Sequence, residues 1–290
     1  MNNEQKCISG IYTISAEEYH ADHGLTPSLS ASTAHILCSQ SPLHAWTASR
    51  RLNPNFVEEE STAMDVGKVA HALLLEGIEI TEVLDYPDWR TNAAKAARDV
   101  ARQAGKVPLL KQKWSHVQAL VFAAKRQLAD HADASHALLG GKPEQSLFWF
   151  DEEYGINGRA RLDYLSDDRK QITDLKTSGI TANPDAVSRS LFQNGLDIQA
   201  EWYRRGVKIL TGVEAEFRFV FVETVPPYAL SVIALGPEAQ VMAQKKIAWA
   251  AEAWKKCLDS GKWPGWPNKT CFAELPPWEE ARWLEKELAI

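Results

Sequence analysis

Two carboxylates and a lysine lie in two short neighbouring runs of the sequence, and residues of these types can perform metal-dependent chemistry. Asp163 lies in Gly158–Leu165, and Asp174 and Lys176 lie in Gln171–Thr177. Two carboxylates suit a hard divalent cation such as Mg²⁺, which takes oxygen ligands and keeps several waters. Such an ion polarises a phosphate and lowers the pKa of a bound water, and a nearby lysine can offset charge on phosphoryl oxygens. The alternative is a solvated hairpin with a surface Asp–Lys pair.

The spacing of these runs predicts a β-hairpin. Residues 166–169 are turn-like, so we expect Asp163 to pair with Ile172 across the hairpin. Because side chains alternate between the two faces of a strand, this register places Asp163, Asp174 and Lys176 on one face. A slip of one residue would separate the two acids, so the prediction depends on the register.

Three further residues could complete such a site. Gln199 and Tyr203 lie four apart on a helix predicted over 197–210, so both project from one face and could grip a phosphate or a metal-bound water. His71 lies in the middle of another predicted helix, one turn after Gly67, and imidazole is a frequent metal ligand. The alternatives without a chemical role are a core Tyr203 beside a partly exposed Gln199, and a hydrogen-bonded core His71.

Basic side chains near these runs could hold phosphates. Arg159 and Arg161 share the strand parity of Asp163, so we expect them to face the same side and to bind DNA together with Arg204. Basic residues on helices are also common on solvated faces.

The composition sets limits on function. The chain has 290 residues, of which 45% are hydrophobic, which is enough for a substantial core. Its 32 basic and 38 acidic residues give a net charge of −6, which excludes a uniformly basic nucleic-acid binder but not an acidic metal site beside a local basic groove. We find no apolar run long enough for a membrane span and no signal peptide, so we expect a cytoplasmic protein.

The four cysteines, Cys7, Cys38, Cys257 and Cys271, are scattered and contain no C-x-x-C pair. We therefore expect structural thiols rather than disulfides. An iron–sulfur cluster held by one early and three late cysteines would need one more late cysteine than the two present here, so we do not expect a cluster.

Periodicity predicts a single α/β domain in which helices flank a mixed central sheet. The expected parts are a helical N-terminal part (about 1–140), a catalytic sheet core (about 141–260) and a tail rich in Trp and Pro (261–290). Short helices are expected to begin near Ser15, at Ser30 or Ser32, and at Ser41. The longer expected helices are 61–76, 91–104, 111–130, 184–192, 197–210 and 237–258, and the expected strands are 145–150, 156–165, 171–177, 215–223 and 228–235.

Taken together, these residues resemble the PD-(D/E)xK nucleases of the RecB-like branch, and most closely the RecE-type exonuclease VIII nuclease domains. The resemblance runs over most of the chain and includes Ser41–Trp46 and the Gly67-x-x-x-His71 helix. The joint motif is specific because five spaced positions must coincide on the right elements. Its members are His71, Asp163, Asp174-Leu175-Lys176 and Gln199-x-x-x-Tyr203.

The resemblance implies a role for each matched residue. The metal ligands would be His71, Asp163, Asp174 and the carbonyl of Leu175. The catalytic residues would be Asp163, Asp174, Lys176, Gln199 and Tyr203, with Lys176 positioning the nucleophile and the last two lying against the substrate strand. Glu144 is a weaker candidate for an outer acid.

The resemblance also implies an activity and partners. We expect a Mg²⁺-dependent exonuclease, tolerant of Mn²⁺, that digests double-stranded DNA from its ends in the 5′-to-3′ direction and leaves 3′ single-stranded tails for phage or prophage recombination. A single-strand annealing recombinase would be its partner, and a homo-oligomeric ring, expected to be a tetramer, would enclose the DNA. The alternatives are an endonuclease or another nucleic-acid-processing nuclease with this fold, and a DNA-binding module with an inactive site.

Overall fold

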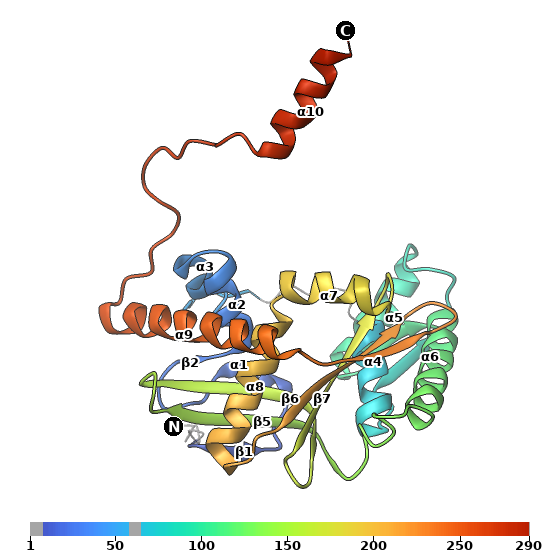
Figure 1. The fold of residues 1–290 in the computed structure, drawn as a ribbon. Helices are drawn as coiled ribbons and strands as arrows, with labels where there is room; N and C mark the ends of the chain where they lie inside the picture. Colours follow the sequence, from blue (N-terminus) through green and yellow to red (C-terminus); the bar gives the residue numbers. More distant parts are fainter. Residues whose placement is uncertain (1–7, 58–64, 290) are drawn as a thin grey trace.

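The computed structural model describes residues 8–57 and 65–289 and shows a mixed sheet covered by helices on both faces (Figure 1). The expected fold class is therefore confirmed. The strands follow the order β1-β5-β6-β7-β8-β9, and β2 pairs with β6. Their bounds are β1 Gly10–Tyr12, β2 Ser28–Leu29, β5 Gly141–Asp151, β6 Ile156–Ser166, β7 Gln171–Ser178, β8 Glu216–Glu223 and β9 Leu230–Ile233.

The helices form two groups on the two faces of this sheet. One face carries α2 (Ala31–Ser39), α8 (Leu196–Thr211) and α9 (Pro237–Ser260), and the other carries α4 (Asp65–His71) and α6 (Lys111–Ala129). The remaining helices are α1 Ala16–Ala21, α3 Pro42–Thr47, α5 Asn92–Gln103, α7 Pro184–Gln193 and α10 Pro277–Leu288. No helix in the described residues is both long and apolar enough to cross a membrane.

The hairpin of β6 and β7 differs from the predicted register by two residues. Leu165 pairs with Ile172, whereas the sequence predicted that Asp163 would do so. The turn is longer than expected because side chains bond its backbone: Asp168 accepts from the Lys170 N–H at 3.0 Å. A shift of two residues preserves which side chains share a face, so the acids stay on one side of the sheet.

The two strands then diverge. β6 and β7 pair at only two register positions, while β6 pairs with β5 along most of its length and β7 pairs in parallel with all of β8. The result is a fork between β6 and β7, with Asp163 and Asp174 at its base.

The N-terminal part is mainly helical, as predicted, and its described residues also contain four short strands that the sequence did not predict. β1 and β2 join the central sheet, and β3 (Thr81–Leu84) and β4 (Val107–Leu110) form a separate parallel pair. The helix predicted over 61–76 is α4 followed by a π-helical turn at Ala72–Glu76, while positions 61–64 lie outside the described residues, as does Cys7. The tail contains α10, which the prediction missed.

Two glycines allow a buried tryptophan to join α8 to the sheet. A Cβ atom at Gly158 would lie 2.4 Å from the Trp149 indole, and one at Gly206 would lie 2.7 Å from it. Trp149 packs on Trp202 of α8 with ring centroids 5.0 Å apart, and the Trp202 indole N–H donates to the Arg159 carbonyl at 3.2 Å. This contact fixes α8 over β5 and β6.

We expect Gly158→Ala to lower the free energy of unfolding by about 1–3 kcal/mol, because the added methyl group would displace the Trp149 indole from a close-packed core. Gly179→Ala is the matched control, since its Cβ would meet only the Thr224 hydroxyl, at 3.9 Å. Urea denaturation of both variants measures the difference, and equal stabilities would contradict this account of the packing.

Candidate metal centre and active site

The fork positions Asp163 against the backbone of β7. Its Oδ2 accepts a hydrogen bond from the Leu175 N–H at 2.7 Å. If β6 and β7 stayed paired beyond Tyr164 and Thr173, Asp163 would lie opposite Asp174. Instead the Asp163 carboxylate accepts the hydrogen bond from β7 that the backbone of β6 would accept in a continuous ladder. Leu175 thus contributes its N–H here, and its carbonyl as a metal ligand stays a prediction.

Asp174 is held by two of the residues that the sequence motif singled out. Its side chain is 1% exposed; Oδ2 lies 2.5 Å from the Lys176 Nζ, and Oδ1 accepts from the Gln199 Nε2 at 2.6 Å. Gln199 reaches it from α8, which the Trp149–Trp202 contact holds over the sheet. The predicted grouping of these three residues is therefore present in the structure, with Gln199 bonded to the acid rather than open to a substrate.

His71, Glu144 and Asp163 form a second group, whose ligand atoms all lie within 4.8 Å of one another. The His71 Nδ1 is 3.8 Å from the Asp163 Oδ2. His71 is the last residue of α4, which comes close to β7 at Gly67: a Cβ there would lie 3.2 Å from the Thr177 hydroxyl. A side chain at the position one turn before His71 would therefore crowd the Thr177 hydroxyl, and glycine leaves room for the close approach of the helix.

Glu144 reaches this group through an unusual backbone conformation. Its φ is +52°, in the left-handed region that a glutamate rarely occupies within a strand, and it lies between the paired residues Pro143 and Gln145. The β5–β6 register sets it opposite Asp163. Arg161 fixes the carboxylate, since its Nε donates to Glu144 Oε2 at 2.8 Å. Strained residues of this kind cluster at functional sites, and the sequence predicted Glu144 only as an outer acid.

Burial makes the two aspartates hard to ionise. It raises the pKa of Asp163 to about 6, and burial together with the charge of Asp163 raises the pKa of Asp174 to about 6. Burial also lowers the pKa of His71, which therefore favours the neutral, ligating form. For Lys176, burial opposes the charge, but Asp174 and Asp163 outweigh it and raise the pKa, so the ammonium persists at neutral pH.

These donors fit a divalent cation. His71, Glu144 and Asp163 offer one imidazole nitrogen and two carboxylates within reach of one ion. Burial raises the pKa of the Asp163 carboxyl to about 6, and a bound cation would offset that cost of ionisation. A carboxylate-rich set suits Mg²⁺, and the imidazole also suits Mn²⁺. Asp174 lies beside this group, and whether it is a ligand stays a prediction.

Tyr203 projects from α8 into the same region and is nearly buried. Burial raises its pKa well above the ordinary tyrosine value, so the hydroxyl stays neutral and can donate a hydrogen bond. Its ring packs on Phe217 with centroids 6.1 Å apart.

The three arginines predicted to bind DNA make intramolecular contacts. Arg159 pairs with Asp22 at 3.0 Å, and Arg161 bonds Glu144 and the Ile14 carbonyl. The third, Arg204, pairs with Glu201 at 2.7 Å and donates to the Ala215 carbonyl. Of the two strand arginines, Arg161 contacts the candidate metal group, through Glu144. Direct DNA binding by any of the three stays a prediction.

The sequence matches, over residues 38–272, the family described as a PDDEXK-like domain of unknown function, DUF3799. The chain belongs to this family. The PD-(D/E)xK fold that the motif predicted is thus confirmed, whereas the finer likeness to RecE-type domains is not tested by this match. None of the curated proteins matches the sequence significantly.

Two solved structures are similar to this PDDEXK-like domain to different degrees. A protein of Eubacterium rectale, named as a candidate exonuclease, matches with a TM-score of 0.60 at 14% identity over 91% of this chain and 97% of its own. A phage-related exonuclease from Haemophilus somnus 129PT matches with a TM-score of 0.33 at 14% identity over 81% of this chain and 97% of its own. At this identity the first match shows a shared fold.

We expect Mn²⁺ or Mg²⁺ to raise the unfolding temperature strongly above about pH 6 and only weakly at pH 5, because metal binding requires ionised carboxylates. The direction of this pH dependence follows from the raised pKa of both aspartates. In the folded protein without metal, the stability that their protonated forms contribute is complete below the ordinary pKa of 3.8 and is lost as the pH rises through about 6. A bound cation offsets that loss.

Differential scanning fluorimetry across this pH range, with and without metal, measures the effect. Glu144→Gln should reduce the metal-induced shift, and Glu252→Gln, on the exposed face of α9, is the matched control. A shift that is independent of pH, or that Glu144→Gln leaves unchanged, would contradict the assignment of this metal centre.

Proposed function

We propose that this PDDEXK-like domain is a metal-dependent nuclease that hydrolyses phosphodiester bonds in DNA. The observation that carries the proposal is the placement of the His71–Glu144–Asp163 group next to the Asp174–Lys176 pair in one fork of the sheet. A bound divalent cation would polarise the scissile phosphate and lower the pKa of a water nucleophile.

The chain's own residues would orient the reaction. Lys176 keeps its proton because Asp174 and Asp163 stabilise the ammonium, so it can donate to a phosphoryl oxygen or hold the attacking water. Gln199 fixes the carboxylate to which Lys176 is bound. The neutral hydroxyl of Tyr203 offers a further donor towards the substrate strand.

We expect Lys176→Met to lower the rate of DNA hydrolysis by about 10²–10³-fold, as loss of one transition-state donor does elsewhere. Lys111→Met is the control, because this lysine pairs with Asp85 at the surface. Release of acid-soluble nucleotides from labelled duplex, with Mg²⁺ or with EDTA, gives the rates, and an unfolding curve for each variant checks the fold. Near-normal hydrolysis by Lys176→Met would exclude the proposed role.

In more detail, we propose digestion of double-stranded DNA from its ends, 5′ to 3′, leaving 3′ tails for phage or prophage recombination with a single-strand annealing recombinase as partner. The motif's resemblance to RecE-type domains supports this substrate and direction, and the name of the Eubacterium rectale protein supports exonuclease action. A homo-oligomeric ring, proposed as a tetramer, would enclose the duplex and favour processive digestion.

We expect linear duplex to be degraded and relaxed closed-circular DNA to survive, because an enzyme that threads a DNA end cannot begin on a circle. Blocked 5′ ends should protect the linear duplex, and blocked 3′ ends should not. Gel electrophoresis of both substrates over the same time course distinguishes the cases. Nicking of the circle would favour an endonuclease, and binding without cleavage of either DNA would favour an inactive DNA-binding module.

A further inference from the structure

The C-terminal helix α10 exposes an apolar stripe. Trp278, Ala281, Leu284 and Leu288 recur at spacings of three and four residues and therefore share one face of the helix. No residue of α10 is buried; Trp278 is 66% exposed and Leu288 is 88% exposed. A helix of twelve residues is marginally stable in water by itself, so this stripe requires a surface that covers it.

The chain before α10 is anchored to the body and then leaves it. The Trp263 ring packs on Trp254 with centroids 5.2 Å apart, the Pro264 carbonyl accepts from the Leu43 N–H at 3.1 Å, and Trp266 lies against His44. Beyond this point the chain runs away from the domain, and α10 stands well clear of it (Figure 1). The connecting segment is therefore fixed to the body at residues 263–266, and α10 projects away from it.

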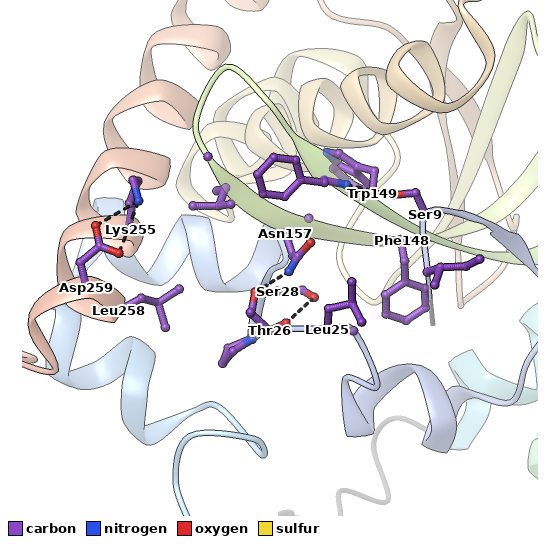
Figure 2. A pocket seen from close by; sticks show the side chains of 17 residues that line it. Ser9, Leu25, Thr26, Ser28, Phe148, Trp149, Asn157, Lys255, Leu258 and Asp259 are labelled. Carbon is purple, nitrogen blue, oxygen red and sulfur yellow. Dashed lines mark hydrogen bonds and ion pairs between the residues drawn. The ribbon is translucent and has the colours of Figure 1, made fainter. Parts of the chain in front are cut away.

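The body carries an apolar pocket of about 560 Å³ that has no part in the metal centre (Figure 2). It lies between the β5–β6 hairpin, the segment before β2 and the C-terminal end of α9. Large apolar side chains at its rim face solvent: Ile8 is 65%, Leu25 is 57% and Phe150 is 49% exposed. Exposed apolar concavities of this kind mark binding sites for other molecules.

We propose that α10 of one chain docks its apolar stripe into this pocket of a second copy of the chain. The aromatic and aliphatic side chains of the stripe match the apolar lining of the pocket, as anchor residues do at protein interfaces. Their charges also agree: α10 carries Glu279, Glu280, Glu285 and Glu287 against Arg282 and Lys286, while the α9 edge of the pocket carries Lys255 and the adjacent Lys256, with Asp259 paired to Lys255.

This contact joins two different surfaces, so it is heterologous, and repeating it from copy to copy gives a ring when the rotation between neighbours closes and a filament when it does not. It rests on the ring assembly proposed above and names the element that links neighbours. Nuclease chemistry and assembly use separate residues, because the pocket lining contains none of the metal-centre residues. The two proposals can therefore fail independently.

Light scattering coupled to size-exclusion chromatography tests the helix side of the contact. The triple variant Trp278→Ala, Leu284→Ala, Leu288→Ala should reduce the full-length oligomer to single chains. Trp283→Ala is the matched control, because this tryptophan lies on the other side of the helix, where its indole N–H donates to Glu287. Since α10 buries none of its residues, the metal-induced thermal shift of the triple variant should equal that of the unaltered chain.

Mixing variants tests the pocket side. Leu25→Glu should also give single chains, whereas Phe122→Glu, an exposed apolar position on α6 away from the pocket, should not. The triple variant keeps a pocket and Leu25→Glu keeps a helix stripe, so mixing these two chains should restore a two-chain species.

Two results would overturn the docking proposal. One is a single-chain mass for the unaltered protein, which would mean that α10 folds onto its own chain or binds a different partner. The other is an oligomer that the triple variant or Leu25→Glu leaves intact. Failure of DNA hydrolysis in a protein that still assembles would count against the nuclease proposal alone.

Discussion

The divergence of β6 and β7 after two paired positions determines the geometry of the site. Where the strands separate, the Leu175 N–H bonds the Asp163 carboxylate instead of a neighbouring strand. Asp174 remains in the parallel pairing of β7 with β8 and is therefore fixed from its other edge. Backbone interactions thus hold the two acids close together. In these buried positions both carboxyl groups are harder to ionise, and the pKa of each is raised to about 6.

The helices complete the site from opposite faces of the sheet. Gln199 comes from α8, whose position over β5 and β6 depends on the Trp149–Trp202 contact and on two glycines. His71 comes from α4, on the other face, which can approach β7 because residue 67 has no side chain. The site therefore depends on the packing of helices on both faces of the sheet. A packing defect on the α8 face should displace Gln199, and one on the α4 face should displace His71.

The sequence predicted the elements of the site well because their patterns are local. The bounds of β6, β7 and α8 were each predicted to within one residue, and the shared face of the two acids survived the error in register, since that error was an even number. The register itself was missed because side chains in the turn, such as Asp168, bond the backbone and lengthen the loop. The short strands β1 and β2 exist through tertiary pairing alone. In contrast, α10 has local signals, a proline in its first turn followed by two glutamates, that could have revealed it. The left-handed backbone conformation of Glu144 within β5 has no such local signal in the sequence.

The net charge of the fork predicts that the metal binds before the proposed DNA substrate. Glu144, Asp163 and Asp174 carry three negative charges when ionised, Arg161 and Lys176 carry two positive charges, and His71 favours its neutral form, which leaves a net charge of −1. A phosphodiester strand is repelled by that charge. With a divalent cation among the same side chains the net charge becomes +1, and the repulsion turns into attraction. The proposed DNA substrate would therefore bind this fork more tightly when the cation is present, and DNA and metal should each strengthen the binding of the other.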